Sequence, residues 1–340
     1  MNKRVTIIAE AGVNHNGDLQ LAKQLIEVAA QAGADYVKFQ TFRSEKLVSR
    51  FAEKAEYQKR NMNDSSGNQL EMLRKLELSA ADHQALIAHC KQHHIHFLST
   101  AFDAESIDFL ASLPIDFFKI PSGEATNFLY LKQVAEKGLP VILSTGMCDL
   151  SEVKLAVEVL CRFGLPKEAI TLLHCHTEYP TRMECVNLNA MVAMGRELGL
   201  PVGYSDHTAG IEVPIAATAL GAVVIEKHFT LDRNLPGPDH QASLEPDELK
   251  EMVRCIRHIE IALGSPLKEP SAEELKNRAV ARKSLIAARH ICKGERFSEE
   301  NLTVKRPGTG VSAMRWEQAM GQIAVRDFNE DERIEWEGSE

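Results

Sequence analysis

The sequence predicts an α/β protein: a (β/α)8 barrel followed by a small, mainly β domain. Strand-like and helix-like runs alternate eight times from Val5 onward, and eight parallel strands close such a barrel. A barrel of this kind takes roughly 250 residues, which leaves room for one appended domain in a chain of 340. The predicted strands span residues 5–12, 35–42, 96–102, 116–123, 140–147, 170–180, 201–208 and 223–231.

Helical patterns lie between the predicted strands, and several are bounded by residues that favour helix ends. Asp18 and Ser79 stand before two of these patterns, where their side chains can accept hydrogen bonds from the first free amides. Gly33 and Gly199 follow two of them, as glycine often does at a helix C-terminus. We expect the last helix of the barrel to finish near Gly264.

Three segments are predicted along the chain: a catalytic barrel over residues 1–264, a linker over 265–281 and a small domain over 282–340. The linker is rich in charge and carries two prolines, so we expect one helical turn in it. The small domain has brief apolar stretches separated by turn residues. It is expected to be compact, irregular and only marginally stable by itself.

The composition is that of an ordinary globular protein, with 44% hydrophobic and 26% charged residues. A formal charge of -9 argues against a nucleic-acid surface, since no basic stripe is available to neutralise phosphates. Small anionic substrates remain possible, because a few lysines close to the binding site are enough to bind them. The sequence shows neither a long apolar run nor a signal-peptide pattern at its start, so we expect a cytoplasmic protein. Seven cysteines, odd in number and without a CxxC motif, favour reduced core thiols over disulfides.

Two histidines, His207 and His228, stand at the ends of two consecutive predicted strands. The strand–helix–strand order makes those strands parallel neighbours, with both imidazoles at the carboxyl end. Each histidine alone would be read as a hydrogen-bonded barrel residue. Two at matching positions, beside Ser205, Asp206 and Glu226, favour ligands of a divalent metal ion, because neutral imidazole suits Mn, Fe and Zn.

Lysines lie inside two predicted strands, at Lys38 and Lys119. A buried ammonium group must be paired with an anion. The partner could be an internal carboxylate, Glu10 or Glu226, but we expect a ligand phosphate or carboxylate. Catalytic groups of such barrels come from the carboxyl ends of several strands. Other polar residues at these ends are Asn14, Gln40, Thr100, Ser122, Glu124, Ser144, Thr177, Tyr179 and Ser205.

Other histidines and one long connection carry weaker signals. His93, His94 and His96 lie where a helix gives way to a strand, and we expect a solvated helix end there rather than a metal site. The polar segment from Arg43 to Asn68 exceeds the usual loop length. It is either a loop that covers the active site or a disordered insertion.

Nine motifs in order resemble those of the sialic acid synthase family: IIAEAGVNHNGD, VKFQTF, FLSTAFD, FKIPSGE, ILSTGM, HTEYPT, GYSDHT, EKHF and PGPDHQASLEP. KRPGTG resembles the arginine-bearing segment of the family's C-terminal antifreeze-like (SAF) domain. The resemblance implies a synthase that condenses phosphoenolpyruvate with an N-acetylated hexose. The acceptor would be N-acetylmannosamine or a 2,4-diacetamido-trideoxy analogue, and the products a nonulosonic acid and phosphate.

The resemblance also implies roles for single residues. It makes His207 and His228 ligands of a divalent ion, typically Mn or Mg, and gives Glu124 the handling of protons at the reacting carbonyl. It implies that Arg306 reaches the active site of a second subunit, in a domain-swapped homodimer. Some relatives carry Asn at the position of Thr177, which leaves the acceptor sugar open. The positions that match substrate contacts are Lys38, Gln40, Thr100, Lys119, Ser122, Ser144, Tyr179 and Ser205.

Glu10 or Glu226 is expected to orient the water that adds to the enol-ether carbon, so that phosphate leaves by C–O cleavage. Within the family, the product could be N-acetylneuraminate, legionaminate or pseudaminate. Two other functions remain open: a phosphoenolpyruvate aldol-type enzyme that accepts a sugar phosphate, and a non-enzymatic carbohydrate- or ice-binding protein. The barrel lysines and paired histidines speak against the second, because a binding surface does not require buried charges.

Overall fold

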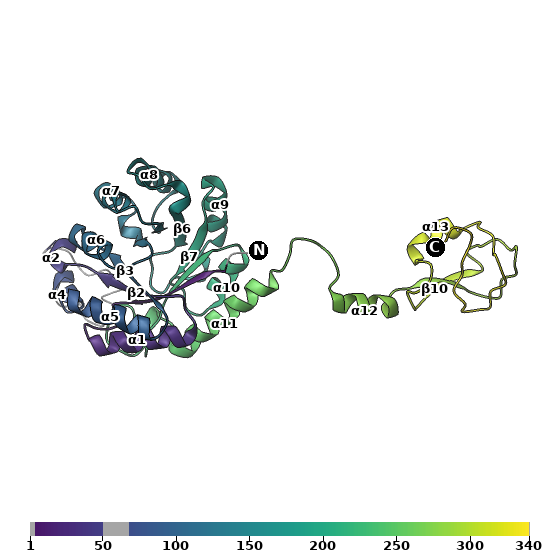
Figure 1. The fold of residues 1–340 in the computed structure, drawn as a ribbon, viewed down its shortest axis with the longest axis horizontal. Coiled ribbons are helices and arrows are strands. Elements are labelled where there is room, and N and C mark those ends of the chain that lie inside the picture. The colour runs from purple at the N-terminus through teal and green to yellow at the C-terminus, as the bar shows by residue number, and fades with distance from the viewer. Residues whose placement is uncertain (1–3, 50–67, 340) are drawn as a thin grey trace. The chain divides into compact units, whose positions relative to one another are not determined.

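The computed structural model describes residues 4–49 and 68–339, which form two compact units, Met1–Gly264 and Ser265–Glu340. In the larger unit, eight parallel strands follow the order β3-β2-β1-β8-β7-β6-β5-β4. The two end strands, β3 and β4, contact each other, which confirms the predicted barrel (Figure 1). The strands are β1 (Thr6–Gly12), β2 (Tyr36–Thr41), β3 (His96–Ala101), β4 (Phe118–Ile120), β5 (Val141–Ser144), β6 (Ile170–Cys175), β7 (Val202–Asp206) and β8 (Val224–His228).

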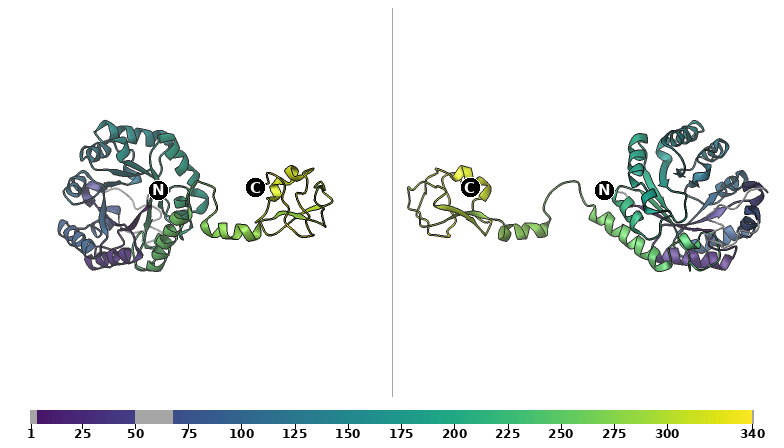
Figure 2. Two further views of the ribbon diagram at one scale, coloured as in Figure 1. Left: turned by 45° about the vertical axis from the view of Figure 1, so that its right-hand side comes forward. Right: turned by 180° about the vertical axis from the view of Figure 1, so that it is seen from behind.

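Helices surround the strands of this unit (Figure 2). Side chains predicted to start helices do so: Asp18 accepts hydrogen bonds from two amides of α1, and Ser79 forms a capping box with Asp82 at α5. Gly33 ends α1 in the left-handed conformation. The helices are α1 (Leu19–Ala32), α2 (Ser44–Leu47), α4 (Gln69–Arg74), α5 (Ala80–Gln92), α6 (Ala104–Ala111), α7 (Phe128–Glu136), α8 (Leu150–Arg162), α9 (Leu188–Leu198), α10 (Glu212–Ala219) and α11 (Pro246–Ala262).

The inward face of the barrel has an apolar layer beneath a polar one. On β1, Ile8 lies two residues before Glu10, and on β8, Val224 lies two residues before Glu226. Alternate residues of a strand point to the same side, so the second member of each pair stands nearer the carboxyl end. Ile8, Leu98, Ile142, Leu173 and Val224 form one buried apolar cluster. This cluster is the floor on which the polar site rests.

The segment after β2, expected to be a lid or a disordered insertion, falls mostly on residues 50–67, outside the described part of the chain. Its described ends form α2 and α4. The amide of Ser44 donates to Glu77 Oε1 at 2.7 Å, which anchors the start of α2. Met72 and Leu73 of α4 pack in a buried apolar cluster with neighbouring side chains. Both ends of the segment are therefore held against the barrel.

The smaller unit contains an antiparallel pair, β9 (Ser284–Ala287) and β10 (Leu302–Lys305), and a short helix, α13 (Trp316–Ala319). Its compact apolar core includes Phe297, Phe328 and Trp336. The expectation of one helical turn before this core is wrong, because α12 (Ala272–Ala281) spans ten residues. Ser271 and Glu274 form a capping box there, a helix start signal that the charge-rich composition had obscured.

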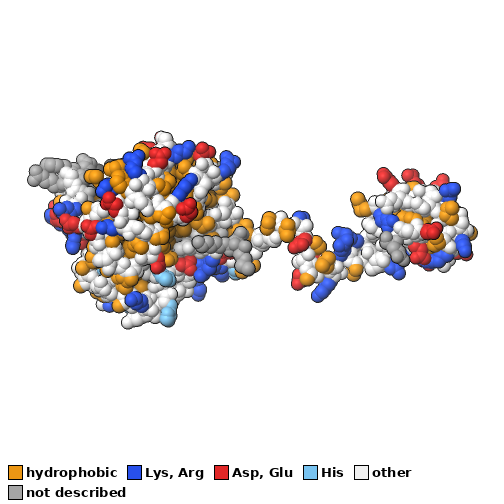
Figure 3. Space-filling view, turned by 45° about the horizontal axis from the view of Figure 1, so that its top comes forward, with side chains coloured by type: hydrophobic (Ala, Val, Ile, Leu, Met, Phe, Trp, Pro, Cys, Tyr) orange, Lys and Arg blue, Asp and Glu red, His pale blue; other side chains and the backbone are white. Residues whose placement is uncertain are grey.

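Charges of both signs are interspersed on the face of the larger unit seen in Figure 3, which agrees with the absence of a basic stripe in the sequence. Within the described residues, no helix is long and apolar enough to cross a membrane. All seven cysteines are free, but only Cys90 and Cys175 are buried. Cys148 and Cys161 are partly buried and pack against the core, so the expectation of core thiols is wrong only for Cys185, Cys255 and Cys292.

Candidate active site

A cavity of about 310 Å³ opens at the carboxyl ends of the barrel strands, where (β/α)8 enzymes place their active sites. Its size is that of a small-molecule site. Twelve of the fourteen predicted site residues line it: Glu10, Lys38, Gln40, Thr100, Lys119, Ser122, Ser144, Tyr179, Ser205, His207, Glu226 and His228.

Two lysines and two glutamates form a buried ionic network in this cavity. Lys38 Nζ lies 2.7 Å from Glu10 Oε2 and 3.8 Å from Glu226 Oε2. Lys119 Nζ lies 3.5 Å from Glu226 Oε1. All four side chains are at most 5% exposed. The internal carboxylates considered in the sequence analysis are therefore the immediate partners of the lysines, and the network still faces the cavity.

Burial and charge shift the pKa values of these four groups in different directions. Burial raises the pKa of Glu10 to about 7, against the opposing charge of Lys38. Burial also opposes ionisation of Glu226, yet the charges of Lys119 and Lys38 hold its pKa below the ordinary value. Burial lowers the pKa of Lys119. For Lys38, burial acts in the same direction but the charges of Glu10 and Glu226 prevail and raise the pKa. Glu10 is thus able to exchange a proton near neutral pH.

Hydroxyl groups extend the network around the lysines. Lys119 donates to Ser144 Oγ at 2.8 Å, Lys38 donates to Thr100 Oγ1 at 3.0 Å, and Ser205 donates to Glu226 Oε1 at 2.9 Å. Each hydroxyl is on a strand next to that of its partner. The parallel register therefore brings a small donor or acceptor to each charged group, ready to contact a ligand oxygen.

One backbone amide close to the cavity is already used within the protein. The amide of Gly146 donates to Ser122 Oγ at 3.0 Å and Gly146 is buried, so this amide is not open to a ligand oxyanion. A Cβ at this position would lie 2.7 Å from Thr177 and 2.8 Å from Ser122. Glycine is needed here for the close approach of these segments and not for an open amide.

The imidazoles of His207 and His228 lie side by side in the cavity, with ring centroids 5.4 Å apart. His207 Nδ1 hydrogen-bonds the carbonyl oxygen of His176. That bond makes Nδ1 the donor and leaves the lone pair on Nε2, as in many metal-binding histidines. Burial lowers the pKa of His207 to about 4 and that of His228 well below its ordinary value, so both rings are neutral.

A buried nitrogen atom without a hydrogen-bond partner supports the presence of a ligand at His207 and His228. His228 Nδ1 is buried and has no hydrogen-bond partner within the described residues, and buried polar atoms normally have one. Two neutral imidazoles are ligands that suit a divalent transition ion, and the carboxylates of Glu10 and Glu226 line the same cavity. The residues present therefore fit the metal that the sequence suggests.

Two neighbours of the histidines differ from the sequence prediction. Asp206, expected beside the metal ligands, points away from the cavity and pairs with Lys227, and both side chains are fully buried. Asp239, to which the sequence analysis gave no role, lines the cavity. Burial raises the pKa of Asp239 to about 6. The only sequence signal was its place within PGPDHQASLEP, because Asp239 lies on a loop and not at a strand end.

Two predicted site residues do not line this cavity. Glu124 is half-buried and accepts a hydrogen bond from Asn127 Nδ2 at 2.7 Å, and burial raises its pKa. Its neighbour Gly123 does line the cavity. Arg306 belongs to the smaller unit, where its Nε donates to the carbonyl of Ala281 at 3.0 Å. The roles of both residues remain predictions.

One wall of the cavity is apolar, in contrast to the charged side chains of the ionic network. It comes from α2, α4 and the ends of β1 and β3. Among the described residues that line the cavity, the cations are Lys38 and Lys119. The apolar wall therefore brings no further ammonium or guanidinium group to the site. Its side chains are Val13, Leu47, Val48, Met72, Leu73, Leu76 and Phe102.

Fold and site together define a (β/α)8-barrel enzyme whose cavity combines a buried lysine–glutamate network with a pair of neutral histidines. A profile of the NeuB family matches residues 25–268, and a profile of the SAF domain matches residues 282–338. The chain belongs to the NeuB family, as its motifs predict.

Individual relatives are similar over nearly the whole chain. The chain is 55% identical to an N,N'-diacetyllegionaminic acid synthase of Campylobacter jejuni, over 98% of this chain and 99% of the relative. It is 50% identical to a protein of the same name from Legionella pneumophila, over 97% and 93%. The crystal structure of an N-acetylneuraminic acid (sialic acid) synthetase from Leptospira borgpetersenii, 36% identical, superposes with a TM-score of 0.72 over 81% of this chain and 90% of the other.

Proposed function

We propose that this chain condenses phosphoenolpyruvate with an N-acetylated hexose to give a nonulosonic acid and phosphate. The observation that carries the proposal is the pair of buried lysines, Lys38 and Lys119, that face a cavity of about 310 Å³. Glu10 and Glu226 already pair with these ammonium groups, but both lysines still line the cavity, where they can contact the phosphate and the carboxylate of phosphoenolpyruvate. The names of the NeuB relatives agree with this chemistry.

The residues of the cavity bind and orient the reactants. Lys38 and Lys119 hold the phosphate and the carboxylate, and the hydroxyls of Thr100, Ser122 and Ser144 complete the contacts to their oxygens. Gln40 and Tyr179 face the sugar. Held in this way, the methylene carbon of phosphoenolpyruvate stands near the aldehyde carbon of the open-chain sugar, which removes much of the entropic barrier to their reaction.

The reaction then needs one carbon–carbon bond and one added water. The methylene carbon attacks the aldehyde carbon, and the aldehyde oxygen takes up a proton to become a hydroxyl. Water adds to the resulting cationic carbon and gives up one proton to a carboxylate. The new hydroxyl passes its remaining proton to the departing phosphate as the C–O bond breaks, which leaves the keto group. Glu10, with a pKa of about 7, is suited to both proton transfers. Glu226 and Glu124 are the alternative carboxylates.

Charge balance supports a divalent ion, Mn or Mg, on His207 and His228. Lys38 and Lys119 already face Glu10 and Glu226, so the network has little positive charge left for a multiply charged anion. A divalent cation supplies that charge and, when bound, polarises the aldehyde as a Lewis acid. A proton taken up by Glu10 is the other source of balance.

The apolar wall supports a 2,4-diacetamido-trideoxy hexose as the acceptor. Such a sugar presents a C6 methyl and two acetamido methyls, which suit side chains such as Leu47, Met72 and Leu73. A 6-phosphate would meet this wall without a cation from the described residues that form it. The two relatives at 55% and 50% identity carry the name N,N'-diacetyllegionaminic acid synthase. N-acetylmannosamine is the second candidate acceptor.

A phosphate-release assay tests the substrate assignment. The full chain, supplied with Mn²⁺ and phosphoenolpyruvate, is given the diacetamido sugar, N-acetylmannosamine or N-acetylmannosamine 6-phosphate. We expect the highest kcat/KM with the diacetamido sugar and the lowest with the 6-phosphate. Equal values for all three would remove the acceptor assignment, and no release with any of them would remove the proposed reaction.

An isotope experiment tests the bond that breaks. Phosphoenolpyruvate carrying ¹⁸O at the bridging position should yield labelled phosphate, because the proposed route cleaves the C–O bond. Label retained in the keto acid would show P–O cleavage instead and would contradict the water-addition step.

We also propose a homodimer in which Arg306 of one copy completes the cavity of the other, as the family resemblance implies. A subunit-mixing experiment tests this homodimer. Arg306→Ala and His207→Ala proteins should each be inactive alone, and they should regain part of the wild-type turnover after their subunits exchange. No recovery in mixed dimers would assign Arg306 to its own chain.

The seven free cysteines support a reducing compartment such as the cytoplasm.

A further inference from the structure

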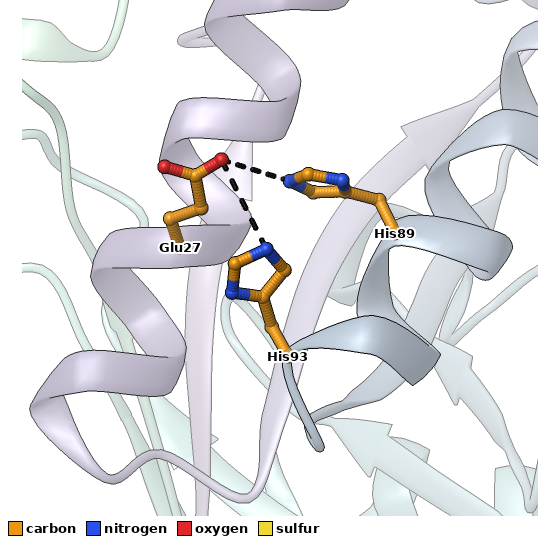
Figure 4. Close-up of side chains that lie close together, drawn as sticks. All are labelled: Glu27, His89 and His93. Atoms are coloured by element: carbon orange, nitrogen blue, oxygen red, sulfur yellow. Dashed lines mark hydrogen bonds and ion pairs between the residues drawn. The ribbon is translucent and has the colours of Figure 1, made fainter.

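Three potential metal ligands converge outside the barrel, away from the proposed catalytic cavity. Glu27 belongs to α1, His89 to α5, and His93 is the C-cap of α5. The two histidines are four residues apart and so lie on one face of the helix. Figure 4 shows both rings turned toward the carboxylate of Glu27. The sequence had suggested a solvated helix end for His93, because the approach of α1 could not be seen there.

The distances suit a single small cation. Glu27 Oε1 lies 3.0 Å from His89 Nε2 and 4.0 Å from His93 Nε2, and one ligand atom from each residue lies within 4.8 Å of the others. Ligand atoms around a tetrahedral zinc ion are roughly 3.3 Å apart, given bonds of about 2.0–2.1 Å. Small rotamer adjustments would bring the three ligand atoms into that arrangement.

A simple ion pair explains the cluster less well. A hydrogen bond joins His89 Nε2 to Glu27 Oε1 at 3.0 Å, but the 4.0 Å distance from His93 Nε2 to the same oxygen is too long for a hydrogen bond. The centroids of the two imidazole rings are 4.5 Å apart, so His93 lies close to the pair without a hydrogen bond to Glu27. A metal ion satisfies all three side chains at once, because it binds neutral imidazoles and a carboxylate together.

We propose that Glu27, His89 and His93 bind a zinc-like divalent transition-metal ion that cross-links α1 and α5. Two imidazoles and one carboxylate form a known type of zinc ligand set, with water in the remaining position. Imidazole selects such ions over Mg²⁺. The ligands are partly accessible, with side-chain exposures of 40% for Glu27, 16% for His89 and 34% for His93, so an ion can enter from solvent.

The site is separate from the proposed reaction. None of its three residues lines the catalytic cavity. The ion would join the two outer helices, which pack against each other, and would stabilise the fold by binding only the folded state. Loss of the ion should therefore lower the melting temperature while phosphoenolpyruvate-dependent turnover, measured below that temperature, persists.

A zinc titration of the full chain tests the proposal. Metal is first removed with a chelator, and the barrel site is then saturated with Mn²⁺ before Zn²⁺ is added in a calorimeter. We expect the wild type to bind one more equivalent of Zn²⁺ than His93→Gln or Glu27→Gln. His94→Asn is the matched control, since His94 is the next residue along the chain and its positive φ of 56° is one that asparagine tolerates.

Melting curves supply the second measurement. Zn²⁺ should raise Tm more in the wild type and in His94→Asn than in His93→Gln and Glu27→Gln, because the two ligand variants keep only the barrel site. Equal zinc stoichiometry in all four proteins would overturn the proposal, as would loss of turnover in both ligand variants. If one ligand variant does not fold, the other decides. The zinc readout does not depend on turnover, so failure of the proposed reaction would be seen separately.

Discussion

Two sets of buried charges lie on neighbouring strands of the barrel and face opposite ways. Toward the cavity, Lys38 and Lys119 share Glu226 at 3.8 and 3.5 Å. Toward the helices, Lys227 has a partner of its own, with Nζ at 2.5 Å from Asp206 Oδ2 and 2.5 Å from the carbonyl of Thr208. In the inner set, two lysines share one glutamate and a ligand in the cavity can reach them. The outer pair, Lys227 and Asp206, is closed, since both side chains are fully buried and no ligand can reach them.

This difference separates function from stability. In the closed pair, Asp206 also accepts from Thr208 Oγ1 at 2.9 Å and from its amide at 3.1 Å, so its hydrogen-bonding capacity is used within the protein. The strand ends that carry His207 and His228 flank this pair. We infer that the outer pair holds these ends in place, while the inner network stays accessible to a ligand in the cavity.

The largest expected effect is on stability, from the outer pair. Lys227→Met leaves Asp206 as an unpaired buried charge, and breaking such a pair costs about 3–5 kcal/mol. Urea unfolding should show a loss of that size. The double variant Lys227→Met/Asp206→Leu should recover most of it, because two apolar residues replace the pair. A double variant no more stable than the single one would show that Thr208, and not charge pairing, dominates this site.

The matching change in the inner network should affect catalysis instead. Lys119→Met removes one contact to the substrate anion, and loss of one partner of a buried charge pair weakens binding by about 2–5 kcal/mol. We expect kcat/KM for phosphoenolpyruvate to fall roughly 100-fold or more. Stability should change little, because Glu226 keeps Lys38 and Ser205. A large loss of stability with near-normal kcat/KM would make the inner network structural as well.

A third prediction concerns pH and a buried imidazole, that of His15. Burial lowers the pKa of its imidazole to about 4, and His15 is 0% exposed. The unfolded chain binds this proton below about pH 6.5, so the stabilisation is complete above that pH and is lost as the pH falls toward 4. Between pH 7 and pH 4.5, the free energy of unfolding should drop by on the order of 2 kcal/mol from this group.

His15→Asn is the variant to compare, because its Oδ1 can accept the amide of Gly17 as His15 Nδ1 does at 3.0 Å. Other buried histidines contribute to the same acid destabilisation, so the measured quantity is the difference in slope between wild type and variant. Parallel curves would mean that His15 titrates normally in the folded protein.

The smallest effect is expected at a solvent-exposed pair. Lys132 Nζ lies 2.7 Å from Glu136 Oε1 on α7, with side chains 37% and 48% exposed. Such i,i+4 pairs contribute about 0.3–0.5 kcal/mol. Glu136→Gln should therefore change the free energy of unfolding by no more than that, and the change should vanish in high salt. A change comparable with that of Lys227→Met would undo the contrast between buried and exposed pairs.

Much of the fold could be predicted because local rules agree with it. Each predicted strand overlaps an observed one, and β1 (Thr6–Gly12) differs from its prediction by a single residue. β4 is shorter than predicted, Phe118–Ile120, since the following Ser122–Glu124 forms a 3-10 turn. Neighbouring side chains of a strand point to opposite faces of the sheet. The sequence therefore already implied that the side chain of Asp206 points away from the face that carries His207. The prediction was wrong because it grouped residues by sequence proximity alone.

The sequence by itself determined the barrel, its strand-end lysines and histidines and the family, because alternation, helix signals and ordered motifs are local properties of the chain. Only the tertiary structure decided which charges pair with which. It brought Asp239 into the cavity from a loop, joined Glu27 to His89 and His93 across two helices, and separated the open network from the closed pair. These relations depend on distances between residues far apart in the chain, which packing sets and no local pattern encodes.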